Sequence, residues 1–121
     1  MKYLCLIYDE EKTFGAMSKS EIDAFMAEYG AFTESIQKGG QYVGGYQLAP
    51  VSAATTVRVR NGKVSSVDGP FAETKEQLGG YYLIEARDLN EAIQIASRIP
   101  SARFGSVEVR PLHDSHHVAP A

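Results

Sequence analysis

The amino-acid sequence predicts one small α+β domain. Its 121 residues suit a single hydrophobic core, and its 44% hydrophobic and 22% charged residues are typical of a globular chain. Segments with the alternation of strands and segments with the spacing of amphipathic helices follow one another along the chain. Their order is strand, helix, strand, then a hairpin, then strand, helix, strand.

The first strand and the first helix have clear sequence signals. Residues 3–8 form a continuous apolar run that ends at acidic residues, which predicts a strand buried on both faces. Residues 10–17 are expected to form a loop. Ser18 and Glu21 have the spacing of a capping box, and apolar residues recur every three or four positions after it. Gly39 and Gly40 are expected to end this helix with a left-handed cap.

The middle of the chain is predicted to be strands. Residues 41–48 are strand-like but contain Gly44 and Gly45, which indicate either a bulge or a close approach of a ligand to the backbone. Residues 55–60 alternate, and Asn61-Gly62 is the strongest short signal for a hairpin that returns over residues 63–67.

The last third repeats the strand–helix–strand order. A strand is predicted over residues 80–86, and Asp88 is expected to cap a second helix that Pro100 closes. Residues 106–112 form the final strand. This order is that of a split βαβ, or ferredoxin-like, domain with a β-hairpin inserted before its third principal strand.

Charge and cysteine content exclude several classes of protein. The net charge of −3 lacks the basic surface that nucleic acid requires, and the same deficit disfavours an anionic membrane. The apolar run at the N-terminus is too short for a signal peptide or a membrane span. Cys5 is the single cysteine, so no disulfide framework is expected and the cytoplasm is the predicted location.

Residues 68–76, DGPFAETKE, are the most distinctive stretch. Asp-Gly-Pro is a cluster of turn formers, and Phe71 is expected to anchor the turn in the core. Together with the QLGGYYLIEA that follows, this stretch resembles the YCII-related family, in particular its DGPF branch. The resemblance covers nearly the whole chain. It implies a ferredoxin-like domain over residues 1–112 that pairs with a second copy as a dimeric α+β barrel. The prolines and the scarcity of apolar residues after it predict a flexible tail over residues 113–121.

Asp68 is the first candidate for catalysis. A carboxylate held by a turn at a strand end and facing the cavity between the sheets would act as a general base if burial raised its pKa. Alternatively, Asp68 only accepts hydrogen bonds from the turn, which would lower its pKa. Both interpretations remain open.

Four further residues are candidates for binding a substrate. Arg58 and Lys75 would orient an anionic group, and Tyr46 and Tyr81 would supply aromatic walls with hydroxyl tips. The alternatives are ion pairs for the two cations and core packing for the tyrosines.

The histidines depart from what the resemblance implies. Some YCII-related proteins resemble enzymes that pair a histidine near the first helix with an aspartate, but here all three histidines, His113, His116 and His117, lie in the tail. Their spacing would bring them together only on a helix, which the nearby prolines disfavour, so neither a metal site nor a cofactor is predicted.

Two functions follow from these residues. The first is a homodimer that binds a small molecule and carries acid–base activity centred on Asp68. The alternative is a non-catalytic accessory module, because members of the family resemble proteins associated with extracytoplasmic-function sigma factors.

Overall fold

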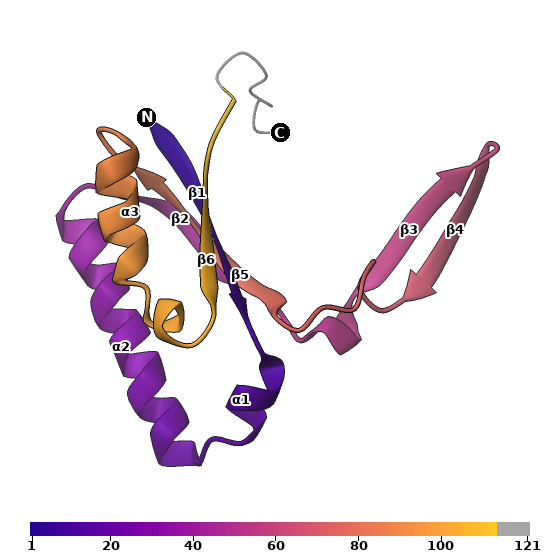
Figure 1. Cartoon of the computed structure of the whole chain (residues 1–121), viewed down its shortest axis with the longest axis horizontal. Helices are drawn as coiled ribbons and strands as arrows, with labels where there is room; N and C mark the ends of the chain where they lie inside the picture. Colours follow the sequence, from indigo (N-terminus) through magenta and orange to yellow (C-terminus); the bar gives the residue numbers. More distant parts are fainter. Residues whose placement is uncertain (114–121) are drawn as a thin grey trace.

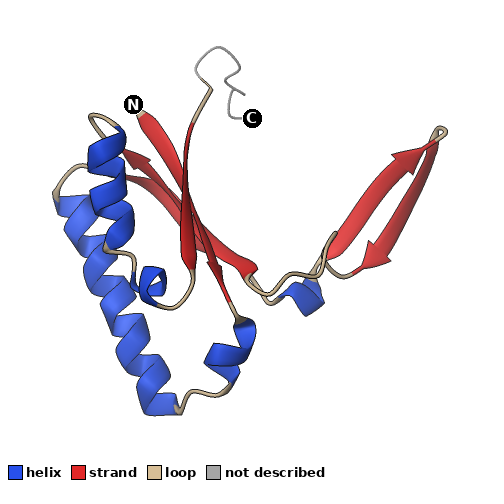
Figure 2. Cartoon of the chain, viewed as in Figure 1, coloured by secondary structure: helices blue, strands red, loops and turns tan. Residues whose placement is uncertain are grey.

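The computed structural model describes residues 1–113 and has a mixed α+β fold. Four strands form an antiparallel sheet in the order β2-β5-β1-β6, which is the ferredoxin-like order (Figure 1). Their bounds are Lys2–Asp9 for β1, Tyr42–Gln47 for β2, Gln77–Glu85 for β5 and Ser106–Pro111 for β6. The helices α2 (Lys19–Lys38) and α3 (Leu89–Ser97) lie side by side on one face of this sheet (Figure 2).

Strand β1 lies between β5 and β6, and its side chains alternate strictly between two environments. The positions at Tyr3, Cys5, Ile7 and Asp9 are buried, whereas the positions between them are half-buried. The prediction of a strand buried on both faces is therefore wrong for a single chain. Only the face toward the helices is covered, and within residues 1–113 no second layer lies on the outer face of the sheet.

The helix ends match their sequence signals. The Ser18 hydroxyl accepts a hydrogen bond from the Glu21 amide, and the Glu21 carboxylate accepts one from the Ser18 amide, so the predicted capping box is confirmed. Gly40 has a φ of +73°, the left-handed conformation expected after the helix. The loop predicted over residues 10–17 is wrong in part, because Glu11–Gly15 forms the short helix α1.

One hydrophobic core joins α2 and α3 to the inner face of the sheet. Its buried members are Tyr3, Cys5, Ile7, Phe32, Ile36, Ile84, Ala86, Ala92, Ile95, Ala96 and Ile99. Burial raises the pKa of the Cys5 thiol to about 11, so this cysteine is a core residue that stays protonated at neutral pH.

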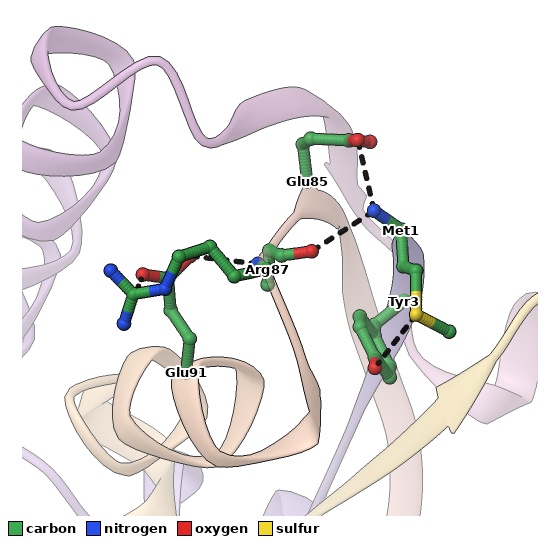
Figure 3. A network of polar contacts seen from close by, with 6 residues as sticks. Met1, Tyr3, Glu85, Arg87 and Glu91 are labelled. Carbon is green, nitrogen blue, oxygen red and sulfur yellow. Dashed lines mark hydrogen bonds and ion pairs between the residues drawn. The ribbon is translucent and has the colours of Figure 1, made fainter.

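Polar contacts hold the beginning of the chain against the end of β5. The Met1 ammonium donates hydrogen bonds to the Glu85 carboxylate and to the Ala86 carbonyl, each at 3.0 Å (Figure 3). Beside them, the Arg87 amide donates to Glu91, and the Arg87 guanidinium pairs with the same carboxylate at 3.1 Å. Asp88 accepts from the Glu91 amide at 2.9 Å, which confirms it as the cap of α3.

Strands β3 (Thr55–Arg60) and β4 (Lys63–Asp68) pair only with each other and project away from the body (Figure 1). We call residues 55–68 the arm. Asn61 and Gly62 at its tip have φ angles of 52° and 75°, as a tight primed turn requires. The expectation that Phe71 anchors the following turn in the core is wrong. Its side chain is 80% exposed, because the turn follows the end of the arm, away from the hydrophobic core.

The two glycines of β2 have different surroundings. A bulge separates Tyr42 from Gly44, which supports the first of the two interpretations for this pair. A Cβ atom at Gly45 would lie 2.7 Å from the Tyr81 carbonyl oxygen and 3.0 Å from the Tyr82 ring, whereas one at Gly44 would contact nothing within 4 Å. Of the two glycines of β2, only Gly45 therefore lies where strand β5 approaches its backbone closely.

We expect Gly45→Ala to lower the free energy of unfolding by about 1–3 kcal/mol, because the new methyl group meets backbone that cannot move without breaking the sheet. Gly44→Ala is the matched control and should change it by no more than about 0.5 kcal/mol. Urea unfolding of both variants measures the difference. Equal midpoints for the two would contradict the close approach.

Candidate functional site

A cavity of about 620 Å³ lies between the inner face of the sheet and the helices α1 and α2. This volume is within the range of sites for small molecules. The strands β1, β2 and β5, both helices, and the short 3₁₀ helix η2 (Pro100–Arg103) contribute to its wall. Most of the wall is apolar or aromatic; the residues with polar side chains are Asp9, Glu11, Tyr29, Thr33, Tyr42, Tyr46, Gln47, Tyr81, Tyr82 and Ser101.

A chain of hydrogen bonds runs along this wall from a helix to the central strand. The Tyr29 hydroxyl donates to the Ser101 hydroxyl at 2.6 Å, and Ser101 donates to Oδ2 of Asp9 at 3.0 Å. Asp9 is only 7% exposed and Ser101 only 1%. Within residues 1–113, Oδ1 of Asp9 has no hydrogen-bond partner, so this oxygen remains available to a molecule in the cavity.

Three different local rules bring these side chains together. Asp9 takes the inward position that follows Ile7 in the alternation of β1. Tyr29 belongs to the apolar stripe of α2 and packs edge-on against Phe25. Ser101 lies in η2, which begins at Pro100, where the proline ring prevents α3 from continuing.

The site disfavours the ionised form of Asp9. Burial raises the pKa of Asp9, the hydrogen bond from Ser101 opposes that rise, and the charges of Glu76 and Glu11 add to it. Burial likewise raises the pKa of Tyr29, although its bond to Ser101 acts in the other direction. An aspartate whose pKa is raised at a cavity wall is the kind of group that donates or accepts a proton in chemistry near neutral pH.

A second hydroxyl pair lies on the same wall. The Thr33 and Tyr82 hydroxyls are 2.6 Å apart, and Thr33 also donates to the Tyr29 carbonyl at 2.9 Å. The Tyr82 ring packs edge-on against Phe32, which orients the hydroxyl. Burial raises the pKa of Tyr82 as well, so the hydroxyl stays protonated at neutral pH.

Two of the residues predicted to bind a substrate border this cavity. Tyr46 and Tyr81 are register partners on β2 and β5, with ring centroids 6.3 Å apart, and both contribute to the wall. The prediction that Tyr46 and Tyr81 bind a ligand stays untested. Tyr46 is 74% exposed, so a ligand inside the cavity would leave much of its ring in contact with solvent.

The other predicted residues lie elsewhere in the described chain. Asp68 ends β4 and Arg58 lies on β3, both with exposed side chains, and neither lines the cavity. Lys75 also lies outside the wall, with its ammonium 3.8 Å from the Glu10 carboxylate. Their predicted roles are not tested by this placement, but in one chain they do not share a site with Asp9.

The histidine tail falls mostly outside the described residues, since the description ends at His113 and both His116 and His117 follow it. In residues 1–113, no cluster of three or more potential metal ligands occurs. Over the same residues, no helix combines the length and the apolar character needed to cross a membrane.

Sequence reasoning missed Asp9, Ser101 and Tyr29 as a site. Asp9 was interpreted as the acidic end of an apolar strand, although the spacing Tyr3, Cys5, Ile7, Asp9 places it on the inner face. Tyr29 falls within the apolar spacing of the helix predicted after Ser18, where nothing distinguishes it from a core residue. No sequence signal marks Ser101, because its position depends on the turn after α3.

Comparison with known proteins agrees with this fold. A family model, the YCII-related domain, matches residues 1–115. An uncharacterised protein of Rhizobium meliloti (strain 1021) is 40% identical over 114 residues, which cover 93% of this chain and 92% of that protein.

A solved structure has a similar fold. It is the 5-chloro-2-hydroxyhydroquinone dehydrochlorinase TftG of Burkholderia phenoliruptrix AC1100, in complex with 2,5-dihydroxybenzoquinone. The match covers 93% of this chain and 94% of that one, with a TM-score of 0.53 and 16% sequence identity. At this identity the likeness concerns the fold. The family model and the Rhizobium protein, taken together with the DGPF stretch, show that this chain belongs to the YCII-related family.

Proposed function

We propose that this protein binds a small molecule in the cavity between its sheet and α2, and that Asp9 exchanges a proton with the bound molecule. The observation that carries the proposal is the buried Asp9 carboxylate on the cavity wall, with one oxygen held by Ser101 and the other without a partner in residues 1–113. A general base must lie within hydrogen-bond reach of the bound molecule and have a pKa shifted toward the working pH. The position of Asp9 and its raised pKa meet both requirements.

The hydroxyl chain explains how Asp9 would work. When Asp9 accepts a proton from a ligand atom, its carboxylate becomes a neutral carboxylic acid and the ligand keeps the electron pair. The hydrogen bonds from Ser101 and, through it, from Tyr29 keep the carboxylate oriented in the ionised state. Burial favours the protonated state, so the energies of the two states approach each other.

The relatives support a small-molecule function without naming a ligand for this chain. The dehydrochlorinase with a similar fold was solved with a small ring compound. In the aromatic wall, Phe25 contacts the Phe14 ring in a tilted arrangement and the Tyr29 ring edge-on, with centroids 5.3 Å apart in each pair, and this wall suits a flat ring of similar size.

Asp68 remains a second candidate for the base, because nothing in a single chain tests the prediction made from the DGPF stretch. In a dimer, the arm would carry Asp68 and Arg58 to a neighbouring chain. The accessory role beside sigma factors and the cytoplasmic location also stay predictions.

We further propose that the active form is a homodimer in which the arm packs on the second copy. The arm exposes four valines, Val57, Val59, Val64 and Val67, each by more than half. Val59 pairs with Val64 beside Val57, so these three share one face of a two-stranded ribbon that has no other layer. An isolated ribbon of this kind has marginal stability in water, which favours a covered state.

Surface area and charge support the same partner. The chain exposes 8504 Å², whereas a compact monomer of 13.2 kDa exposes about 6,400 Å². The arm carries three basic side chains and one acidic side chain, Asp68, so the remainder of the chain has 9 basic and 14 acidic residues and a net charge of −5. A basic arm is therefore complementary to the acidic body of an identical chain.

We expect Asp9→Asn to change how stability depends on pH. Because the pKa of Asp9 is raised on folding, its contribution to stability is complete below the unfolded pKa and is lost as pH rises through the folded pKa. The variant removes this loss and keeps an acceptor for Ser101. As pH rises above about 4, the ordinary pKa of an aspartate, the melting temperature of wild type should therefore fall relative to that of Asp9→Asn until Asp9 is ionised in the folded protein as well.

Glu10→Gln is the matched control, because it removes one negative charge at the neighbouring position, outside the cavity wall. Its melting temperature should follow the wild-type pH profile. If Asp9→Asn and Glu10→Gln give the same profile, Asp9 does not carry the raised pKa.

A thermal-shift panel of small ring compounds separates the two candidate bases. We expect stabilisation of wild type by a ligand to be lost in Asp9→Asn and kept in Asp68→Asn, since only Asp9 lies on the wall. The compounds that bind are then incubated with protein in D₂O, and solvent deuterium in the ligand reports proton exchange. The reverse pattern, with loss only in Asp68→Asn, would assign the site to the DGPF stretch.

Light scattering after size-exclusion chromatography tests the dimer. Wild type should have twice the mass of one chain, and a Val59→Asp, Val64→Asp double variant should dissociate while its circular dichroism remains that of the folded body. A Ser65→Thr variant, uncharged and on the face opposite Val59 and Val64, is the control and should remain dimeric. A monomeric wild type, or a dimeric double variant, would rule out the proposed role of the arm.

A further inference from the structure

We infer that the cavity takes an organic ammonium ion, a protonated amine attached to a ring, whose N–H group donates to Oδ1 of Asp9. This inference rests on the proposed small-molecule site and adds the charge of its ligand. It differs from the expectation, made from Arg58 and Lys75, of an anionic substrate.

The charge of the wall is the first argument. Two carboxylates, Asp9 and Glu11, are among the residues that line the cavity, and no lysine, arginine or histidine of the described chain is among them. A bound carboxylate or phosphate would face these two groups with no cation to pair with it. A cation is attracted by both, and the low dielectric of a largely apolar wall strengthens the attraction.

The position of the Asp9 carboxylate is the second argument. Its side chain is more than nine-tenths buried, Ser101 occupies Oδ2, and Oδ1 has no partner within residues 1–113. Gly79 leaves space in front of that oxygen, since a Cβ atom there would lie 3.4 Å from Oδ1. Oδ1 is open to the cavity rather than sealed in the protein, so a ligand N–H group would reach it and form a charge-assisted hydrogen bond.

The carboxylate of Glu11 is only partly engaged by contacts within the protein. Its Oε2 accepts a hydrogen bond from the Val51 amide at 3.0 Å, which fixes the side chain at the edge of the cavity. Its charge remains uncompensated by any ion pair among the described residues. Glu11 therefore contributes to the negative potential without being the direct partner that Asp9 offers.

The aromatic wall is the third argument. Seven aromatic residues line the cavity: Phe14, Phe25, Tyr29, Tyr42, Tyr46, Tyr81 and Tyr82. Tyr81 pairs with Leu6 and with Tyr46, so the side chains of these two tyrosines lie on the outer face of the sheet and the other five rings face the cavity. Ring faces attract cations, and aromatic rings combined with a carboxylate are a common arrangement for organic ammonium groups. The cation–ring contacts within residues 1–113 use Phe32 and Phe104, which are not among these seven, so no cationic side chain of the described residues competes for the lining rings.

Three probes of the same size and different charge test the inference: benzylamine, benzyl alcohol and benzoate. Binding to the full chain is measured at neutral pH by ligand-observed NMR and calorimetry, at concentrations up to the millimolar range. We expect benzylamine to bind about tenfold or more tightly than benzyl alcohol, as a charge-assisted hydrogen bond predicts, and benzoate not to bind.

Variants connect the preference to Asp9. Asp9→Asn should lose the advantage of benzylamine over benzyl alcohol, whereas Glu10→Gln, which removes a charge outside the wall, should retain it. The wild-type affinity for benzylamine should fall as pH is lowered through the pKa of Asp9. The groups that face Asp9 are Glu11, Glu76, Ser101 and Tyr29, and protonation of either glutamate would act in the same direction.

The outcomes separate this inference from the proposed function. If benzoate binds, or if benzyl alcohol binds as tightly as benzylamine, the ammonium inference is overturned while a small-molecule cavity remains. If Asp9→Asn keeps the preference for benzylamine, the inference is also overturned, because the cation then binds elsewhere. If no probe binds, and the wider panel of ring compounds fails as well, both the inference and the proposed function are rejected.

Discussion

The strict alternation of β1 is the constraint on which the rest of the site depends. This strand lies between β5 and β6, so its inward side chains must enter the core, and the series Tyr3, Cys5, Ile7 continues into Asp9. The chain cannot turn that carboxylate outward without moving the hydrophobic residues before it to the wrong face. Asp9 is therefore buried. The hydrogen bond from Ser101 offsets part of the cost of desolvating its carboxylate, and the part of that cost that is not offset raises the pKa of Asp9.

Strand β1 also separates the proposed ligand site from the surface proposed for assembly. Its inner face borders the cavity, and its outer face, where Leu4 and Leu6 are half-buried, is available to a second chain. In the proposed dimer, ligand binding and assembly would therefore use opposite faces of one sheet. The arm extends from the loop between β2 and β5, and Leu48 and Pro50 in that loop line the cavity. A partner that holds the arm would thus act on one edge of the ligand site, which is a physical route for coupling the two.

Local signals predicted the fold well and the site poorly. The capping box at Ser18, the Asp88 cap and the alternation of the strands depend on neighbouring residues, so the sequence contains their explanation. The site depends on three segments that are distant in sequence, since 72 positions separate Tyr29 from Ser101 and 92 separate Ser101 from Asp9. The prediction that Phe71 lies in the core is wrong for a related reason. A turn signal specifies local backbone geometry but not which surface of the protein lies beside the turn. The family resemblance directed attention to Asp68, whose motif is conspicuous in sequence but exposed in a single chain.

The glycines on the cavity wall limit which parts of the site can change during evolution. Gly45, Gly79 and Gly80 all line it, so part of its floor is bare peptide backbone whose position is set by the hydrogen bonds between β2 and β5. That floor cannot adapt by changing rotamers, and added side chains at Gly45 or Gly80 would collide with the neighbouring strand. The opposite wall consists of flexible side chains, among them Ile22 and Met26 on α2. Divergence toward new ligands is thus expected to proceed by exchange of helix residues over an unchanging strand scaffold, and libraries for redesign belong on α2.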